Sequence, residues 1–176
     1  FHLSMQSGCD AVLKRMNRKY DTARYYESVR LLNQYFDRPA VTTDLIVGFP
    51  GETEEEFVQT LDFIQKCAFS SMHIFPYSKR PGTPAAQRPD QILNHVKEER
   101  VHRAAAVAGA MEQRYLSRWL GETVSVLFEE QRDGAWHGYT TRYVPVCVES
   151  EENLHNCLRD VPISSVEKGA IRGELA

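Results

Sequence analysis

Apolar residues recur along the first two thirds of the chain in two kinds of spacing. Residues 41–47 form a short β-branched run between turn residues, which is typical of a parallel strand buried on both faces. Residues 2–7 resemble the end of another strand, and residues 70–78 form a third apolar run. The stretches between them, residues 10–36 and 53–67, have apolar positions at helical spacing. This order predicts a βαβαβ arrangement with a parallel sheet.

Start signals define where the helices of this region begin. Residues 11–20 predict a short basic helix, and a second helix is expected to begin at Asp21 or Thr22. Thr53 and Glu56 have the spacing of a capping box, so a third helix is expected to begin at Thr53.

The spacing of apolar residues changes in the second half of the chain. Residues 79–89 are rich in turn formers, and residues 90–120 predict a long helix that ends at Gly121. Short alternating β runs follow up to the C-terminus. We therefore predict an α/β domain over residues 1–120, built as a partial barrel or open parallel sheet, and a compact β-barrel over residues 121–176.

Composition limits the class of protein. The chain has 176 residues, 42% of them apolar and 10% aromatic, which is enough for a sizeable core. No apolar run has the length of a membrane span, and residues 1–10 lack the zones of a signal peptide. The net charge of -3 gives no overall attraction for nucleic acid, so RNA binding would depend on local patches.

The four cysteines, Cys9, Cys67, Cys147 and Cys157, are widely separated and show no C-x-x-C spacing. No metal site can be assigned to them. We expect reduced structural thiols in a cytoplasmic protein.

Three loops follow the predicted parallel strands, at residues 6–10, 48–53 and 77–85. Ligands of parallel α/β folds bind at the carboxyl ends of strands, where loops and helix N-termini converge. The loops are polar and rich in glycine, which permits close approach of the backbone to a ligand. We expect a binding site here, although each loop taken alone is also compatible with an ordinary turn.

Three polar residues stand out near these strands. Gln6 can bind a hydroxyl or amide edge, or cap a turn. Asp44 lies within an apolar strand, where a carboxylate is costly unless it is paired or faces a ligand; an ion pair with Arg18 is the structural alternative. Arg18 by itself is most simply a solvated charge on the basic helix.

Taken together, four segments closely resemble the radical S-adenosylmethionine tRNA methylthiotransferases, and best the branch acting on threonylcarbamoyl-adenosine beside the anticodon. The segments are HLSMQSG with LKRMNRKY, VTTDLIVGFPGETEEEF, FPYSKRPGTPA and KEERVHR. In this resemblance, residues 1–120 are similar to the second half of the radical barrel, and residues 121–176 are similar to the TRAM module. The order and spacing of the segments make the resemblance specific.

The resemblance implies radical chemistry. A [4Fe-4S] cluster, reduced by an electron donor, cleaves S-adenosylmethionine, and the resulting radical abstracts hydrogen from adenine C2. A second [4Fe-4S] cluster in an upstream domain takes part in sulfur delivery. By the same resemblance, Gln6 and Asp44 would face the ribose or methionine of the cofactor, and Arg18 its carboxylate. The residues implied to line the adenine are Gly48, Phe49, Pro50, Gly51, Phe75 and Tyr77.

The chain departs from the family pattern in its cysteines. The C-x-x-x-C-x-x-C triad of the radical cluster, the upstream cluster cysteines and the early glycine-rich strand do not occur in it. Cys9 stands where the family usually has Ser, and we do not assign it as a ligand. The chain also begins without Met. We therefore expect the C-terminal part of a longer enzyme, inactive alone because the cluster ligands lie elsewhere.

The stretch HGYTTRYVPVCVE resembles the TRAM core, and this resemblance implies a small barrel that binds RNA by a basic and aromatic surface. Aromatic faces stack on bases and arginines contact phosphates. Half-buried packing is the alternative for the same residues. The acidic run at residues 149–153 argues against a strong general grip, so we expect a module that helps to position tRNA. The candidates are Arg132, Trp136, His137, Tyr139, Arg142 and Tyr143.

Other functions stay open at this stage. Residues 48–53 could form a phosphate loop of a nucleotide-binding domain, although neither a Walker lysine pattern nor G-x-G-x-x-G occurs. Related methylthiotransferases act on isopentenyl-adenosine in tRNA or on a ribosomal-protein aspartate. A non-catalytic RNA-binding remnant would also account for the missing cysteines. The sequence does not indicate the oligomeric state.

Overall fold

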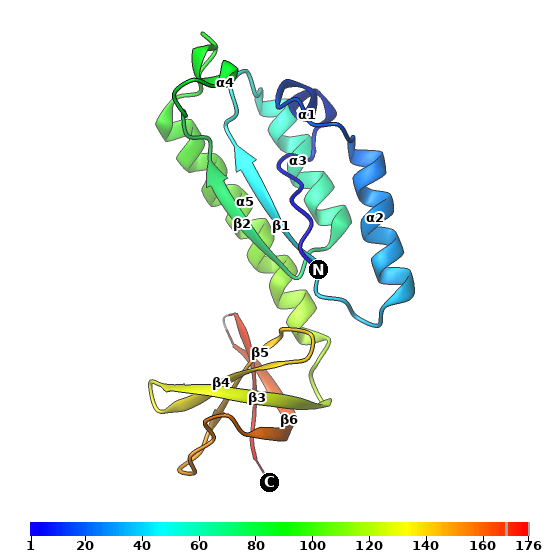
Figure 1. Ribbon diagram of the computed structural model, residues 1–176, viewed down its shortest axis with the longest axis vertical. Coiled ribbons are helices and arrows are strands. Elements are labelled where there is room, and N and C mark those ends of the chain that lie inside the picture. The colour runs from blue at the N-terminus through cyan, green and yellow to red at the C-terminus, as the bar shows by residue number, and fades with distance from the viewer. Residues whose placement is uncertain (168, 176) are drawn as a thin grey trace. The chain divides into compact units, whose positions relative to one another are not determined.

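The computed structural model describes residues 1–167 and 169–175 and divides into two compact units, residues 1–111 and 112–176 (Figure 1). The division lies within α5 (Asn94–Ser117), not at Gly121 as predicted. Tyr115 and Leu116 in the last turn of α5 and Trp119 just beyond it are buried, and the Gly121 N–H donates to the backbone of Ile163 in the second unit. The predicted boundary was therefore placed too late, because the end of the helix belongs to the β module.

The first unit is a βαβ arrangement with an extra extended segment. Strands β1 and β2 pair in parallel, with Asp44 opposite His73. Residues 1–6 run parallel to β1 on its other edge and form bridges at His2 and Gln6. Residues 1–6 are the third extended segment that the sequence predicted, but they pair with β1 through two isolated bridges and not as a continuous strand. The elements are α1 (Asp10–Arg15), α2 (Thr22–Tyr35), β1 (Thr42–Val47), α3 (Glu54–Cys67), β2 (Ser71–Pro76), α4 (Pro84–Gln87) and α5.

Capping explains where the helices begin. The Asp21 carboxylate accepts from the Arg24 N–H at the start of α2, and Thr53 and Glu56 form both bonds of the predicted capping box. The basic helix α1 is shorter than predicted. It ends at Arg15, because Asn17 adopts a left-handed backbone with φ of 59° and turns the chain.

The sequence indicated a strand buried on both faces, but β1 is fully buried on one face only. Thr43, Leu45 and Val47 are buried, whereas Thr42, Asp44 and Ile46 are only partly covered. The covered face packs in a core that includes Tyr25, Phe57 and Phe69 from the helices and their connections. The strand therefore alternates, and its other face is free to form a site.

The second unit is a closed barrel of five strands in the order β3-β4-β5-β7-β6. The small all-β module predicted after residue 121 is confirmed. Alternate positions point inward and form its core, for example Val126, Phe128 and Val146. Its strands are β3 (Thr123–Arg132), β4 (Ala135–Thr140), β5 (Pro145–Glu149), β6 (Leu158–Glu167) and β7 (Ala170–Gly173).

Two further observations concern the described residues. All four cysteines have free thiols, and three of them are buried. No helix in the described ranges combines the length and apolar character needed to cross a bilayer.

Candidate functional site

The three predicted loops follow adjacent parallel segments and so begin at one end of the sheet. The Ile46 N–H donates to the Gln6 carbonyl at 2.9 Å, and the Tyr77 N–H donates to the Val47 carbonyl at 2.8 Å. These bonds join the last residues of the three extended segments. Residues 7–10, 48–53 and 77–83 therefore leave the sheet side by side at its carboxyl end, which we call the carboxyl rim.

Gln6 has a strained backbone at this rim. Its φ is 69°, in the left-handed region, and its side chain is buried. The backbone is held on both sides, since its N–H donates to the Asp44 carbonyl at 2.9 Å while its carbonyl accepts from Ile46. A non-glycine residue in this region costs about 1–3 kcal/mol, and such residues cluster at ligand sites.

The Asp44 carboxylate is paired within the first unit. Its Oδ2 accepts from Ser4 Oγ at 2.9 Å and lies 3.1 Å from His2 Nε2. Partial burial raises the pKa of Asp44, but the bonds from Ser4 and His2 and the nearby imidazoles outweigh it and hold the pKa below its ordinary value. The suggested ion pair with Arg18 is not formed; Arg18 is exposed beyond the end of α1.

The uncovered sheet face around Asp44 is polar and aromatic. His73 lies opposite Asp44 in register, and Phe75 lies opposite Ile46. The His73 and Phe75 rings stack with centroids 6.4 Å apart, and Phe75 is exposed. On the other edge, His2 Nδ1 lies 3.0 Å from Thr42 Oγ1. We call these residues the open face: His2, Ser4, Thr42, Asp44, His73 and Phe75.

Sequence reasoning missed His2, Ser4 and His73 as members of this face. The two-residue period of residues 2, 4 and 6 would have placed His2 and Ser4 beside Gln6 on one side of the segment. The position of His73 depends on the register between β1 and β2, which no local pattern specifies.

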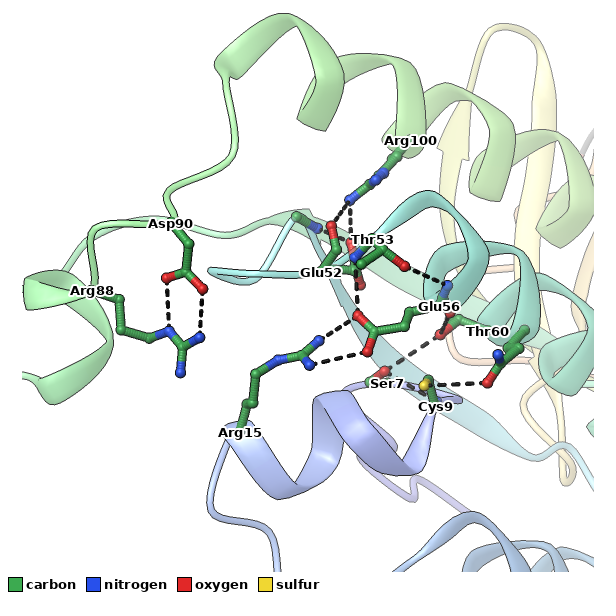
Figure 2. A network of polar contacts seen from close by, with 12 residues as sticks. Ser7, Cys9, Arg15, Glu52, Thr53, Glu56, Thr60, Arg88, Asp90 and Arg100 are labelled. Carbon is green, nitrogen blue, oxygen red and sulfur yellow. Dashed lines mark hydrogen bonds and ion pairs between the residues drawn. The ribbon is translucent and has the colours of Figure 1, made fainter.

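The loop after β1 is fixed by a buried ion pair between Glu52 and Arg100 of α5 (Figure 2). Glu52 Oε2 accepts from Arg100 Nη1 at 2.8 Å and from the Gly48 N–H at 2.6 Å. Burial raises the pKa of Glu52, and the bonds from Gly48 and Arg100 only partly offset this effect. The acidic residue of the predicted loop thus holds the loop in place from inside.

The glycines of this loop are required by packing within the protein. A Cβ at Gly48 would lie 2.3 Å from Lys97 Cγ, and a Cβ at Gly51 would lie 2.4 Å from Asp90 Oδ2. Both residues have positive φ, 69° and 77°, and the Gly51 N–H donates to the Asp90 carbonyl. The segment before and at the start of α5 thus occupies the space that the missing side chains leave.

Phe49 and Tyr77 form an aromatic pair at the rim. Their ring centroids are 5.2 Å apart and the rings are inclined by 72°. The Tyr77 hydroxyl is buried and has no hydrogen-bond partner among the described residues. An aromatic wall with an unused polar group fits an adenine, which offers a π-face and ring-nitrogen acceptors. Phe49 is buried with Cys9 and Val12, and Tyr77 packs against this cluster, so the role of these residues in lining the adenine stays a prediction.

Two further ion pairs brace the rim (Figure 2). Arg15 of α1 donates from both terminal nitrogens to the two oxygens of Glu56 of α3, with Nη1 3.0 Å from Oε1. These bonds lower the pKa of Glu56 despite its partial burial. In the loop before α5, Arg88 binds both oxygens of Asp90, at 2.9 and 2.5 Å.

The described residues do not fit an iron-sulfur cluster. They include no group of three or more His, Cys, Asp or Glu side chains placed to hold a metal. Cys9, the one cysteine near the rim, is buried and donates to Gln59 Oε1 at 3.4 Å. We therefore derive no chemical step through a cluster.

The six RNA candidates of the barrel differ in exposure. Trp136 is 7% exposed and points into the barrel from β4, so its assignment to the surface was wrong. Tyr143 is 81% exposed and Tyr139 is 39% exposed, with their ring centroids 5.8 Å apart. His137 is half-buried.

The two arginines of this set are exposed and engaged locally. Arg132 Nε lies 3.1 Å from Glu130 Oε1, and the Arg142 guanidinium lies 5.4 Å from the centre of the Trp119 ring. Tyr139 and Tyr143 are therefore the members of the set that present free aromatic faces.

Comparison with known proteins defines the class of the chain. The family model of the radical SAM superfamily matches residues 1–64, which include the first two rim loops and β1. The chain is also similar to a threonylcarbamoyladenosine tRNA methylthiotransferase, MtaB of Bacillus subtilis. The two are 42% identical over 87% of this chain and 35% of the relative.

Other relatives carry a different substrate name. A tRNA-2-methylthio-N(6)-dimethylallyladenosine synthase of Pelotomaculum thermopropionicum is 40% identical over 76% of this chain and 30% of its own length. The enzyme of that name from Acetivibrio thermocellus is 38% identical over 99% of this chain and 37% of its own length. The chain belongs to the tRNA methylthiotransferase family of radical SAM proteins. It spans about a third of the length of these relatives.

Proposed function

We propose that this chain supplies the cofactor-facing half-barrel and the RNA-contacting β-barrel of a tRNA methylthiotransferase. In this proposal, residues 1–111 are the second half of a radical SAM barrel and the five-stranded unit is a TRAM module. The observation that carries the proposal is that strained Gln6 and the Phe49 and Tyr77 pair meet at the carboxyl end of a parallel sheet whose open face lies beside them. Such an enzyme would work in the cytoplasm, where tRNA is modified.

The cofactor proposed for the rim is S-adenosylmethionine. Tyr77 has a buried hydroxyl available to donate to adenine, and Arg18 is exposed and available to the methionine carboxylate. S-adenosylmethionine and a reduced [4Fe-4S] cluster would together supply the radical chemistry at C2 of the target adenine. We propose that the ligands of that cluster and of a second cluster lie outside this chain. The electron donor is likewise a separate partner.

The proposed substrate is N6-threonylcarbamoyladenosine beside the anticodon of tRNA. Its threonylcarbamoyl group has a carboxylate, a hydroxyl and a urea, all of which need polar partners. The open face offers imidazoles from His2 and His73 and hydroxyls from Ser4 and Thr42. A dimethylallyl group would add no polar contact here, and His2, Ser4 and Thr42 would keep the hydrogen bonds that they already form with one another and with Asp44.

The alternative substrate is dimethylallyladenosine, because Phe75 also lies on the open face and would pack against an apolar group. The test compares two anticodon stem-loop RNAs, one with each modification, as substrates of the whole enzyme under anaerobic conditions. Mass spectrometry of the nucleosides should show the methylthio product from the threonylcarbamoyl RNA. A product from the dimethylallyl RNA alone would assign the enzyme to the other branch.

Cofactor binding can be tested separately from activity. Asp44→Ala and Arg18→Ala in the whole enzyme should weaken equilibrium binding of S-adenosylmethionine, the first by loosening the segment that bears Gln6 and the second by removing a carboxylate partner. Unchanged affinity in both variants would reject this assignment of the cofactor site.

A further inference from the structure

Two of the three rim segments carry an excess of positive charge, whereas residues 48–56, which include the third, carry four Glu and no Lys or Arg. Residues 7–21 contain four Lys or Arg and two Asp, and residues 77–90 contain three Lys or Arg and one Asp. The whole chain has a net charge of -3. The two segments flank the candidate site, so the excess of cations is concentrated there and not spread over the molecule.

The acidic groups at the rim do not neutralise the outermost cations. Among the described residues, Glu56 pairs with Arg15, Asp90 with Arg88, and Glu52 with Arg100. Of the other carboxylates, Glu54 pairs with Arg103, while Asp10 accepts from the Thr22 N–H and Asp21 from the Arg24 N–H.

Five cations of these two segments remain exposed with no acidic partner in the described part of the chain, and one of them, Arg18, is proposed above for the cofactor carboxylate. We call the other four the basic rim: Lys14, Lys19, Lys79 and Arg80.

The loop that bears Lys79 and Arg80 is held in one backbone conformation. The Arg80 carbonyl accepts from the Thr83 N–H at 3.2 Å and from Thr83 Oγ1 at 2.8 Å. Thr83 also caps α4 through the Ala86 N–H. A loop fixed in this way presents its cations without a large ordering cost on binding.

We propose that the basic rim binds the phosphate backbone of the RNA on either side of the target nucleoside. This inference rests on the proposed function and adds a second RNA contact, separate from the β-barrel. A single small anion would need cations converging on one point. Cations on two elements on both sides of the site instead suit a chain of phosphates that continues beyond the reacting base.

The test measures binding of the protein to an anticodon stem-loop RNA over a range of salt concentrations. Each phosphate contact contributes about 0.7–0.9 to the slope of log affinity against log salt. Lys14→Gln, Lys79→Gln and Arg80→Gln combined should therefore reduce the slope by about two. Lys66→Gln is the control for position, because it removes one charge, against three in the triple variant, from the last turn of α3 at the other end of the sheet. It should leave the slope unchanged.

Each outcome decides the inference. An unchanged slope in the triple variant, with wild-type RNA affinity, would overturn the basic rim and leave the barrel contact standing. A loss in Lys66→Gln equal to a third of the loss in the triple variant would also overturn it, because the effect would then follow net charge and not position. Absence of RNA binding by the wild-type protein would reject both the rim and the proposed function. Competition by inorganic phosphate at concentrations that leave ionic strength constant would assign the rim to a single anion.

Discussion

Arg100 donates from one nitrogen to both the side chain and the backbone of Glu52, at 2.8 and 3.1 Å. The side chains of both residues are almost fully buried, at 5% and 1% exposed. A residue of the long helix thereby fixes the loop that follows β1, nearly fifty positions earlier in the chain. The loop conformation at the candidate site therefore depends on α5 as much as on its own glycines.

Replacing Arg100 should destabilise the first unit strongly. Arg100→Met leaves the Glu52 carboxylate buried with only the Gly48 N–H as donor. We expect a loss of about 3–5 kcal/mol in the free energy of unfolding, because one charge of a buried pair remains uncompensated. Urea unfolding followed by the helix signal in circular dichroism measures this, since the long helices belong mainly to the first unit.

Two variants check the cause of that loss. Arg103→Met removes a half-exposed arginine that pairs with Glu54 and Glu99, and it should cost at most about 1 kcal/mol. Adding Glu52→Gln to Arg100→Met should recover part of the stability. If the two arginine variants were equally stable, the buried pair would not hold the loop.

The pair of Arg15 and Glu56 should make stability depend on pH in the acid range. The folded-state pKa of Glu56 lies below its ordinary 4.5, chiefly because of the hydrogen bonds from Arg15. The stabilisation is therefore fully present above pH 4.5 and is lost as pH falls through the lower folded-state pKa. Glu56→Gln should flatten the curve of unfolding free energy in this window. It keeps the capping box, since Gln serves there as well as Glu.

Glu99→Gln gives the matched control, because Glu99 is an exposed carboxylate of α5. Its curve should keep the acid slope of the wild type. A wild-type slope in Glu56→Gln as well would mean that other carboxylates cause the acid sensitivity.

Local signals in the sequence predicted the elements of the first unit well. The capping box at Thr53 and the cap at Asp21 each fixed the start of a helix, because both depend only on neighbouring residues. The same signals could not show that β1 has one open face. That property depends on which elements cover the strand, and β2 and residues 1–6 flank it on its two edges.

Long-range pairings account for what the sequence did not reveal at the site. Asp44 was predicted to need a partner, and it has one, but His2 and Ser4 lie forty positions earlier and meet it only through the parallel register. Trp136 was assigned to the RNA-binding surface because aromatic faces stack on bases. The inward direction of its side chain follows from the alternation of β4 in a closed barrel.

Closure of the barrel should depend on Gly138. A Cβ at this position would lie 2.3 Å from the Leu127 carbonyl oxygen and 2.8 Å from Phe128 Cα. Both are backbone atoms of the neighbouring strand β3, so Gly138→Ala requires the strands to move apart. We expect a loss of about 1–3 kcal/mol or more, measured by unfolding followed through tryptophan fluorescence of the second unit.

Gly109→Ala makes the same chemical change as Gly138→Ala but should raise the free energy of unfolding. Gly109 lies in α5 and a Cβ there meets nothing within 4 Å. Alanine should stabilise the helix by about 0.5–1 kcal/mol. A neutral Gly138→Ala would show that the barrel has room that the close approach of β3 and β4 does not indicate.

Tyr143 offers a prediction in which stability and RNA binding change in opposite directions. The side chain is 81% exposed, and its φ of 57° lies in the left-handed region. The turn that holds it is fixed by Thr140, whose carbonyl accepts from the Tyr143 N–H and whose hydroxyl accepts from the Val144 N–H. An exposed aromatic ring in a strained backbone costs stability and is explained if the ring stacks on a base.

Tyr143→Gly relieves the strain, so the free energy of unfolding should stay equal or rise by up to about 1 kcal/mol. Affinity for a stem-loop RNA should fall about fivefold or more, the loss of one stacked base. Tyr143→Phe keeps the ring and should bind like the wild type, whereas Trp136→Phe, inside the barrel, should lower stability and leave RNA affinity unchanged. Wild-type RNA affinity in Tyr143→Gly would remove the barrel's aromatic surface from RNA recognition.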